Sequence, residues 1–293
     1  MLYRAYYSHG KMSYKGKNIA AVFGMISILS SVIKKLEPNQ IYICWDAGKN
    51  KRRLELVPEY KAGRGKLGFD YENFNWQKES LLKLLDSLGL NQIIKEKFEA
   101  DDWIYYLVRK FKKDKNNKIY IVSKDKDFDQ LISKRVYVWD DQSNTLLHEK
   151  NLEKIKGYKP EHVVDYLCLI GDKSDNIPGY GGIGPVKASG ILKDHGSIKE
   201  YLKFIFLERD GMHGKVIGTE LKKLYERNQE MICLKTFYVK NLKGKIKLQF
   251  YNEAMGLRLN KKKFIKLSKP FGFKKFVEPN FLKIFKNLNT VGI

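Results

Sequence analysis

The chain has 293 residues, 43% of them hydrophobic, so it holds enough apolar material for a core and its composition excludes an intrinsically disordered chain. Its formal net charge of +23, from 56 Lys and Arg against 33 Asp and Glu, favours a polyanionic partner such as nucleic acid, although an AT-rich genome also enriches lysine. It has no apolar run long enough to span a membrane, no signal-peptide core and no CxxC pair among its three cysteines. We therefore expect a cytoplasmic protein that does not contact a membrane.

The first half of the chain alternates between helical and strand patterns. Apolar residues with helical spacing, and short runs rich in Ile, Val and Tyr, predict helices at 20–36, 77–89 and 100–111 and strands at 41–45, 91–96, 119–123 and 136–140. This alternation is typical of an α/β domain with a parallel sheet.

The remaining segments have a different character. Residues 47–75 are basic and weakly patterned, and from about 160 the pattern becomes mostly helical. Residues 236–293 hold fourteen Lys and Arg but only two acids, interleaved with Phe and Leu. We therefore predict two domains, an α/β core over 1–160 and a helical region with a basic C-terminal segment over 161–293.

Acidic residues follow the predicted strands or lie in the helical region beyond them. They are Asp46, Glu99, Asp101, Asp102, Asp125, Asp127, Asp172 and Asp175. In an open α/β sheet, groups just past the carboxyl ends of the strands line one crevice, and so many like charges there require a counter-ion. Oxygen ligands without nearby His or Cys suit Mg²⁺ or Mn²⁺ and disfavour a zinc hydrolase, and two such ions can cut a phosphodiester. Each acid taken singly also has a purely structural explanation, because it could be a helix cap, a turn residue or a partner of a helix dipole.

A glycine-rich hairpin follows the last two acids. It contains Gly182, Ile183 and Gly184 between two helical segments, with Lys187 one turn further on. Glycines let backbone N–H groups approach a phosphate, and the next helix N-terminus adds positive potential, so the pattern predicts a sequence-independent grip on nucleic acid. The alternative is a tight helix–helix turn without a ligand.

Five motifs in order resemble the structure-specific 5′-nuclease (flap endonuclease) family, in particular the 5′-nuclease domain of bacterial DNA polymerase I and its stand-alone phage relatives. They are "LYRAYY" (2–7), "DAGKNKRRLELVPEYKAGR" (46–64), "EADD" (99–102), "SKDKDFDQL" (123–131) and "GDKSDNIPGYGGIGPVKASGIL" (171–192). A less distinct segment, "LNKKKFIKLSKPFGFKKF" (259–276), is similar to the family's closing helical region. The resemblance implies a PIN-like, Rossmann-like parallel-sheet nuclease core with a helical arch at 47–75 and a helix-three-turn-helix DNA-binding region.

The resemblance also implies roles for individual residues. The eight acids correspond to the family's metal ligands or to acids that support them, with Mg²⁺ or Mn²⁺ as the ions and K⁺ at the hairpin. Lys61 and Arg64 match the basic residues at the foot of the arch, where they stabilise transition-state charge. Tyr60 either stacks on the base beside the cut or packs within the arch. Arg4 either contacts a phosphate or forms a surface salt bridge.

The sequence departs from the family pattern in two places. The family begins with a strand ending in an Asp-Gly pair, which the resemblance places about four residues before Met1. Lys124 and Lys126 flank Asp125, where relatives usually have a smaller residue at the first of these positions. No polymerase domain follows, so we expect a stand-alone nuclease and, on the resemblance alone, a monomer.

These observations favour a 5′-3′ exonuclease and flap endonuclease that acts on branched DNA in primer or flap removal. A ribonuclease H acting on RNA–DNA hybrids is the same chemistry, and the sequence does not separate the two. The absent first Asp motivates an alternative, a structure-specific DNA-binding protein with weak or no cleavage. A PIN-type ribonuclease ranks below both, because it needs neither the hairpin nor the basic arch.

Overall fold

The structure is a computed structural model that describes residues 1–8, 12–48, 50–62, 69–208, 212–244, 258–286 and 288. The chain forms two compact units that interleave in sequence. Unit 1 comprises Met1–Asp46, Leu67–Glu96 and Leu248–Ile293, and unit 2 comprises Ala47–Lys66 and Lys97–Lys247. The domain boundary predicted at residue 160 falls inside unit 2 and stays a prediction.

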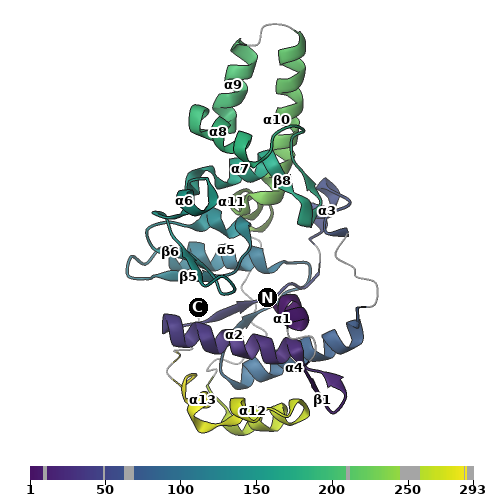
Figure 1. Cartoon of the computed structure of the whole chain (residues 1–293), viewed down its shortest axis with the longest axis vertical. Helices are drawn as coiled ribbons and strands as arrows, with labels where there is room; N and C mark the ends of the chain where they lie inside the picture. The colour runs from purple at the N-terminus through teal and green to yellow at the C-terminus, as the bar shows by residue number, and fades with distance from the viewer. Residues whose placement is uncertain are drawn as a thin grey trace. The chain divides into compact units, whose positions relative to one another are not determined.

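Unit 1 combines helices, among them α1, α2, α4, α12 and α13 in Figure 1, with a short parallel strand pair. Its elements are α1 (Leu2–Ser8), β1 (Ser13–Tyr14), β2 (Lys17–Asn18), α2 (Ala20–Leu36), β3 (Tyr42–Cys44), α4 (Tyr71–Ser87), β4 (Asn91–Ile93), α12 (Lys261–Ser268) and α13 (Pro279–Lys283). Strands β3 and β4 pair in parallel, with Tyr42 opposite Asn91. Helices α2 and α4 pack together, and α12 packs on α4.

The long helices of unit 1 follow from local signals. Helix α2 has the predicted bounds and ends where Glu37 adopts a left-handed conformation, directly before Pro38. Helix α4 begins six residues before the predicted start at 77, because the Asp70 carboxylate caps it by accepting a hydrogen bond from Asn73 N at 2.8 Å. The predicted strand 91–96 is confirmed over 91–93 only.

Unit 2 contains a three-stranded sheet of β5 (Ile119–Val122), β6 (Val136–Asp140) and β7 (Thr145–Leu147). Strands β5 and β6 are parallel, as predicted, and β7, which was not predicted, pairs antiparallel with β6. The predicted parallel pairing is therefore observed, and among the described residues it is divided between two sheets, β3–β4 and β5–β6–β7. Helix α5 (Ala100–Phe111) has the predicted bounds, and α3 (Lys51–Leu56) lies in the segment predicted to be weakly patterned.

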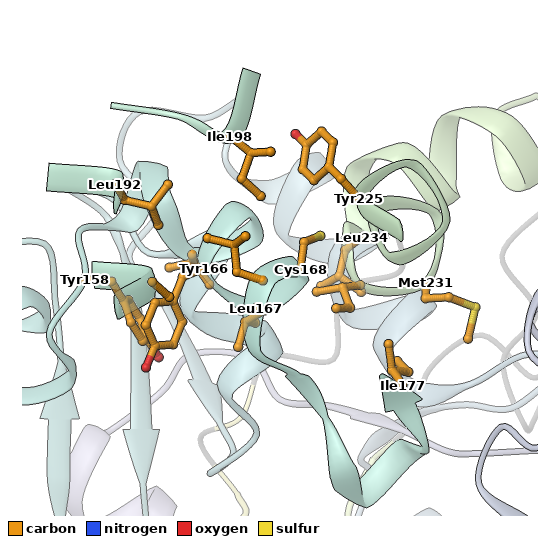
Figure 2. Packing of buried hydrophobic residues seen from close by; sticks show 14 of the residues in the cluster. Tyr158, Tyr166, Leu167, Cys168, Ile177, Leu192, Ile198, Tyr225, Met231 and Leu234 are labelled. Atoms are coloured by element: carbon orange, nitrogen blue, oxygen red, sulfur yellow. The ribbon is translucent and has the colours of Figure 1, made fainter. Parts of the chain in front are cut away.

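The remainder of unit 2 is mostly helical, as predicted. Its elements are α6 (Leu152–Lys156), α7 (Val163–Ile170), β8 (Gly171–Asp172), β9 (Ile177–Pro178), α8 (Pro185–His195), α9 (Ile198–Glu208), α10 (Met212–Ile232) and α11 (Leu234–Phe237). Helix α7 packs against α8 and α10, and Figure 2 shows Leu167, Cys168 and Tyr225 within this buried cluster. None of the helices in the described ranges is both long enough and apolar enough to cross a lipid bilayer.

Candidate active site

The two units divide the predicted site residues between them. Seven of the eight acids, together with Tyr60, Lys61 and the glycine hairpin, belong to unit 2. Asp46 and Arg4 belong to unit 1, where Asp46 follows β3 and its backbone oxygen accepts a hydrogen bond from Lys78 Nζ at 3.0 Å. Arg64 lies outside the described residues.

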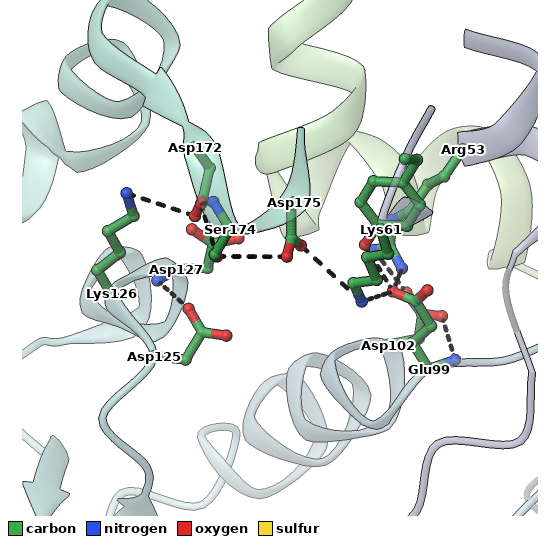
Figure 3. Close-up of polar contacts among 11 residues, drawn as sticks. Arg53, Lys61, Glu99, Asp102, Asp125, Lys126, Asp127, Asp172, Ser174 and Asp175 are labelled. Atoms are coloured by element: carbon green, nitrogen blue, oxygen red, sulfur yellow. Dashed lines mark hydrogen bonds and ion pairs between the residues drawn. The ribbon is translucent and has the colours of Figure 1, made fainter. Parts of the chain in front are cut away.

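Four carboxylates of unit 2 lie near one another on two turns. Asp125 caps the 3₁₀ helix Lys126–Leu131 that follows β5, and its Oδ1 accepts a hydrogen bond from Asp127 N at 3.0 Å. Asp172 ends β8, and its Oδ1 accepts hydrogen bonds from Ser174 N and Ser174 Oγ at 2.8 and 2.7 Å. Ser174 Oγ also contacts Asp175 Oδ1 at 3.4 Å, so the hydroxyl links the last two acids (Figure 3).

Burial and the negative charges of neighbouring acids shift the pKa values of this group. Desolvation by the surrounding protein, then the charges of Asp175 and Asp172, raise the pKa of Asp125. Burial, then the charges of Asp125 and Asp101, hold the pKa of Asp127 well above its ordinary value. Asp172 differs, because the Ser174 hydroxyl and Lys126, at 3.4 Å, outweigh its burial and lower its pKa.

This arrangement fits a divalent cation. Asp127 Oδ1 is buried and, within the described part of the chain, has no hydrogen-bond partner. A desolvated oxygen among like charges is stabilised by a hard cation, and the donors are all oxygens, as Mg²⁺ and Mn²⁺ prefer. Across the described ranges, however, no three Asp, Glu, His or Cys side chains converge into a group that would hold a metal ion as they stand.

Glu99 and Asp102, at the start of α5, form a second cluster in which cations of the protein neutralise the acids. Arg53 is 2% exposed, and its guanidinium donates to Glu99 Oε2 and to Asp102 Oδ1. Lys61 Nζ lies 2.9 Å from Glu99 Oε2 and 3.9 Å from Asp175 Oδ2, so it connects the two clusters. Glu99 and Asp102 also form a capping box at the start of α5.

The pKa shifts of this cluster follow from burial opposed by cations. Burial alone would raise the pKa of Glu99, but the charges of Arg53 and Lys61 outweigh it and hold that pKa below its ordinary value. For Asp102 the desolvation outweighs Arg53, and its pKa is raised. The predicted set of eight metal ligands is therefore split, with Glu99 and Asp102 paired to cations of the protein.

The sequence leaves two roles open for Tyr60, stacking on a base or packing within the arch. Its side chain is 3% exposed, and its hydroxyl donates to Glu99 Oε2 at 2.9 Å. A ring buried in this way has no face available to a base, so the structure favours the alternative role as a packing residue.

The loop that carries Asp172 and Asp175 is held by two features that the sequence did not reveal. Gly171 has a φ of +72°, and a Cβ there would lie 2.3 Å from Gly179 N, so two backbone segments touch. Asn228 is 0% exposed, and its amide donates to Cys168 O at 3.0 Å and Pro178 O at 2.8 Å, on either side of the loop. Asn228 therefore fastens α10 to both ends of this loop.

The glycine hairpin lies between β9 and α8, so the helix predicted after it is present, whereas the element directly before it is a strand and not the predicted helical segment. Gly182 has a φ of +77° with open space around it, and Gly184 is the residue before α8. Ile183 is buried in the core of unit 2, so it anchors the hairpin and does not offer its side chain to a ligand. Lys187 is exposed, and its Nζ lies 3.4 Å from Gly182 O.

Arg53 is the site residue that the sequence analysis missed. It is adjacent to Arg52, whose side chain is 43% exposed, and nothing in "NKRRLEL" distinguishes the two arginines. An amphipathic pattern within α3 would distinguish the buried arginine from the exposed one, but the helix is too short for such a pattern to be recognised in the sequence.

An α/β region with an acidic cluster, followed by a helical region with a phosphate-type hairpin, defines a class of metal-assisted nucleases. Residues 1–163 match the family model described as 5'-3' exonuclease, N-terminal resolvase-like domain, and residues 158–263 match the one described as 5'-3' exonuclease, C-terminal SAM fold. The chain belongs to the 5'-3' exonuclease family. The predicted resemblance, the fold class and the nuclease function are confirmed.

Individual relatives agree with this assignment. The 5'-3' exonuclease of Aquifex aeolicus is 34% identical over 203 residues, covering 69% of each chain. The 5'-3' exonuclease of Mycoplasmopsis pulmonis is 30% identical over 272 residues, covering 92% of this chain and 87% of the relative. Among solved structures, T5 5'-exonuclease with zinc bound has a TM-score of 0.68 at 19% identity, covering 90% of this chain and 94% of that one. The last comparison shows the shared fold.

Proposed function

We propose that the chain hydrolyses phosphodiesters near the 5′ ends and flap junctions of branched DNA with Mg²⁺ or Mn²⁺. The observation that carries the proposal is the gathering of Asp125, Asp127, Asp172 and Asp175 beside Lys61 in one unit. The names of similar structures support the substrate, since one is the catalytic core of Rad2 in complex with DNA. Its TM-score is 0.55.

In this proposal Asp125, Asp127, Asp172 and Asp175 hold the cations, with Asp101 adding negative charge. A ligand role for Asp46, which belongs to unit 1, rests on the sequence resemblance alone. Bound divalent cations would neutralise this cluster and polarise the scissile phosphate. Glu99 and Asp102 support the site by holding Arg53 and Lys61. Lys126, which already pairs with Asp172, limits the repulsion within the cluster when no cation is bound.

Basic residues orient the substrate in this proposal. Lys61 Nζ is fixed between Glu99 and Asp175, so it offers a positioned cation to the phosphate that is cut. Arg64 has the same role, from the sequence resemblance alone. The hairpin Gly182–Gly184, with Lys187 on α8, holds the duplex backbone through N–H groups and charge. Arg4 contacts a phosphate from unit 1.

The finer parts of the proposal rest on the family resemblance. K⁺ binds at the hairpin through backbone carbonyls, an RNA–DNA hybrid is accepted as a second substrate, and the protein is a monomer. With DNA as the substrate, we propose that the protein acts in the cytoplasm of a bacterial cell or of a phage-infected host.

A 5′-labelled flap substrate tests the proposal. The chain is incubated with Mg²⁺ or with EDTA, and the products are resolved on a denaturing gel. We expect cuts near the junction with Mg²⁺ only. The variant Asp172→Asn should bind the flap normally, but its cleavage rate should fall by a factor of about 100 or more. Removing one group that stabilises charge in a transition state lowers the rate by about this factor. Asp194→Asn, an exposed acid on α8, is the matched control and should cut normally.

Cleavage in EDTA, or wild-type cleavage by Asp172→Asn, would contradict the proposed role of the acidic cluster. Loss of flap binding together with cleavage in Asp172→Asn would contradict the division between acids that cut and a hairpin that binds. Binding without any cutting by the wild-type chain would assign it to structure-specific DNA binding.

A further inference from the structure

The C-terminal segment of unit 1 has an unusually one-sided charge. Residues 258–286 contain one acid, Glu278, and ten basic residues: Arg258, Lys261, Lys262, Lys263, Lys266, Lys269, Lys274, Lys275, Lys283 and Lys286. All ten are exposed. Lys263 pairs with Asp86 at 2.7 Å, and within the described part of the chain none of the other lysines contacts a carboxylate. We call these ten residues the basic face.

Buried aromatic rings hold the basic face in place. Phe264 is 0% exposed, and Phe271 stacks on Trp76 of α4 with ring centroids 4.9 Å apart. Phe276 lies 5.1 Å from Phe23 of α2 and 4.9 Å from Phe281. The segment therefore turns its phenylalanines inward and its lysines outward, and the cations are carried on an ordered backbone.

The spacing of three lysines on α12 and at the residue that ends it matches a polymer of phosphates. Lys262, Lys266 and Lys269 are four and three residues apart, so they share the side of the helix opposite the buried Phe264. With a rise of about 1.5 Å per residue they extend over roughly 10 Å. Duplex DNA presents one negative charge per about 1.7 Å of its axis, so a single duplex offers each lysine a phosphate.

The chemistry of the face disfavours a protein partner. Protein interfaces are centred on buried aromatic and aliphatic side chains with few lysines. Here the aromatic residues are internal, and Ile265, 40% exposed, is the one large apolar residue among the described residues 258–286 that is exposed. A face of charge without an apolar centre suits a phosphate backbone.

We propose that the basic face is a second nucleic-acid contact surface, which binds the backbone of duplex DNA without reading its sequence. It lies on unit 1, whereas the hairpin and the acidic cluster lie on unit 2. The inference rests on the proposed function in taking DNA as the substrate.

The salt dependence of binding tests it. Affinity for a long blunt-ended duplex is measured in EDTA at KCl concentrations between about 50 and 200 mM. The variant Lys262→Gln/Lys266→Gln/Lys269→Gln is compared with Lys112→Gln/Lys113→Gln/Lys115→Gln, which removes three exposed charges from unit 2. Each phosphate contact contributes about 0.9 to the slope of log K against log salt, so the first variant should lose between about 2 and 3 from the slope and the control less than about 1.

Equal slopes for the two variants would overturn the inference. A parallel titration with poly-L-glutamate distinguishes an acidic protein partner from duplex DNA. If the first variant loses affinity for this polymer but keeps the wild-type slope for duplex, the face binds protein, and the inference is overturned as well. Because EDTA removes divalent cations and no cleavage is measured, failure of the proposed nuclease function would not change these slopes.

Discussion

Replacing Arg53 by Met removes a buried cation that contacts both Glu99 and Asp102. Arg53 and its two carboxylate partners each have side chains only 2% exposed, so neither acid can be solvated in its place. Breaking a buried ion pair by removing one partner costs about 3 to 5 kcal/mol. The guanidinium also lies 4.2 Å from the Phe237 ring centroid, a contact worth up to about 2 kcal/mol when desolvated. We expect Arg53→Met to lower the free energy of unfolding by about 4 kcal/mol.

Urea unfolding near neutral pH measures this loss, and Arg52→Met is the matched control. Arg52 is 43% exposed and pairs with Glu55 and Glu230 at the surface, so its replacement should cost about 1 kcal/mol or less. If Arg53→Met is no more destabilising than Arg52→Met, the buried ion pairs do not stabilise unit 2 and the reasoning is refuted.

The pH dependence of the unfolding free energy, compared between the wild-type protein and Arg53→Met, gives an independent check of the buried ion pairs. In the wild-type protein the pKa of Glu99 is lowered, so its contribution to stability is present at neutral pH and is lost as the pH falls through the folded-state pKa. Without Arg53, the opposition to burial weakens, so the pKa of Glu99 rises and that of Asp102, already raised, rises further; both acids then take up a proton in the folded state more readily as the pH falls. The difference in unfolding free energy between wild type and Arg53→Met should therefore shrink from about pH 7 to about pH 5. A constant difference would contradict this account.

Three further predictions concern the loops of unit 2. Gly171→Ala should cost on the order of 3 kcal/mol in urea unfolding, since a Cβ meets backbone at 2.3 Å, whereas Gly182→Ala, with open space, should cost about 1 kcal/mol; equal losses would refute the close contact. Asn228→Leu should cost about 2 to 4 kcal/mol, since the buried carbonyl of Cys168 and the partly buried carbonyl of Pro178 lose their donor, and a loss below about 1 kcal/mol would contradict the clamp. Lys187→Ala should weaken duplex binding and lower its salt slope by about one, whereas Lys193→Ala near the other end of α8 should not; an unchanged slope would remove Lys187 from the contact set.

Much of the local structure could be predicted from the sequence. Helices α2 and α5 have the predicted bounds, because each has a clear apolar periodicity and a distinct end signal. Strand β6 also agrees, and the glycine hairpin lies before a helix as its pattern predicts. The positions of Asp125 and Asp127 directly after β5 followed from the same patterns, because a strand and the turn that ends it are encoded by adjacent residues.

What the sequence determined by itself was therefore the set of short-range features: the helices, the strands, the turns between them and the type of chemistry that the acids and lysines favour. Which acids meet a protein cation and which meet only each other was decided by the tertiary structure, since Arg53 reaches Glu99 from 46 residues away. The placement of α12 against α4 was decided in the same way, by rings such as Phe271 and Trp76 that are distant in sequence. The periodicity of apolar residues indicates which side chains are buried. Which residue each of them contacts depends on the packing between segments, and no local pattern encodes that packing.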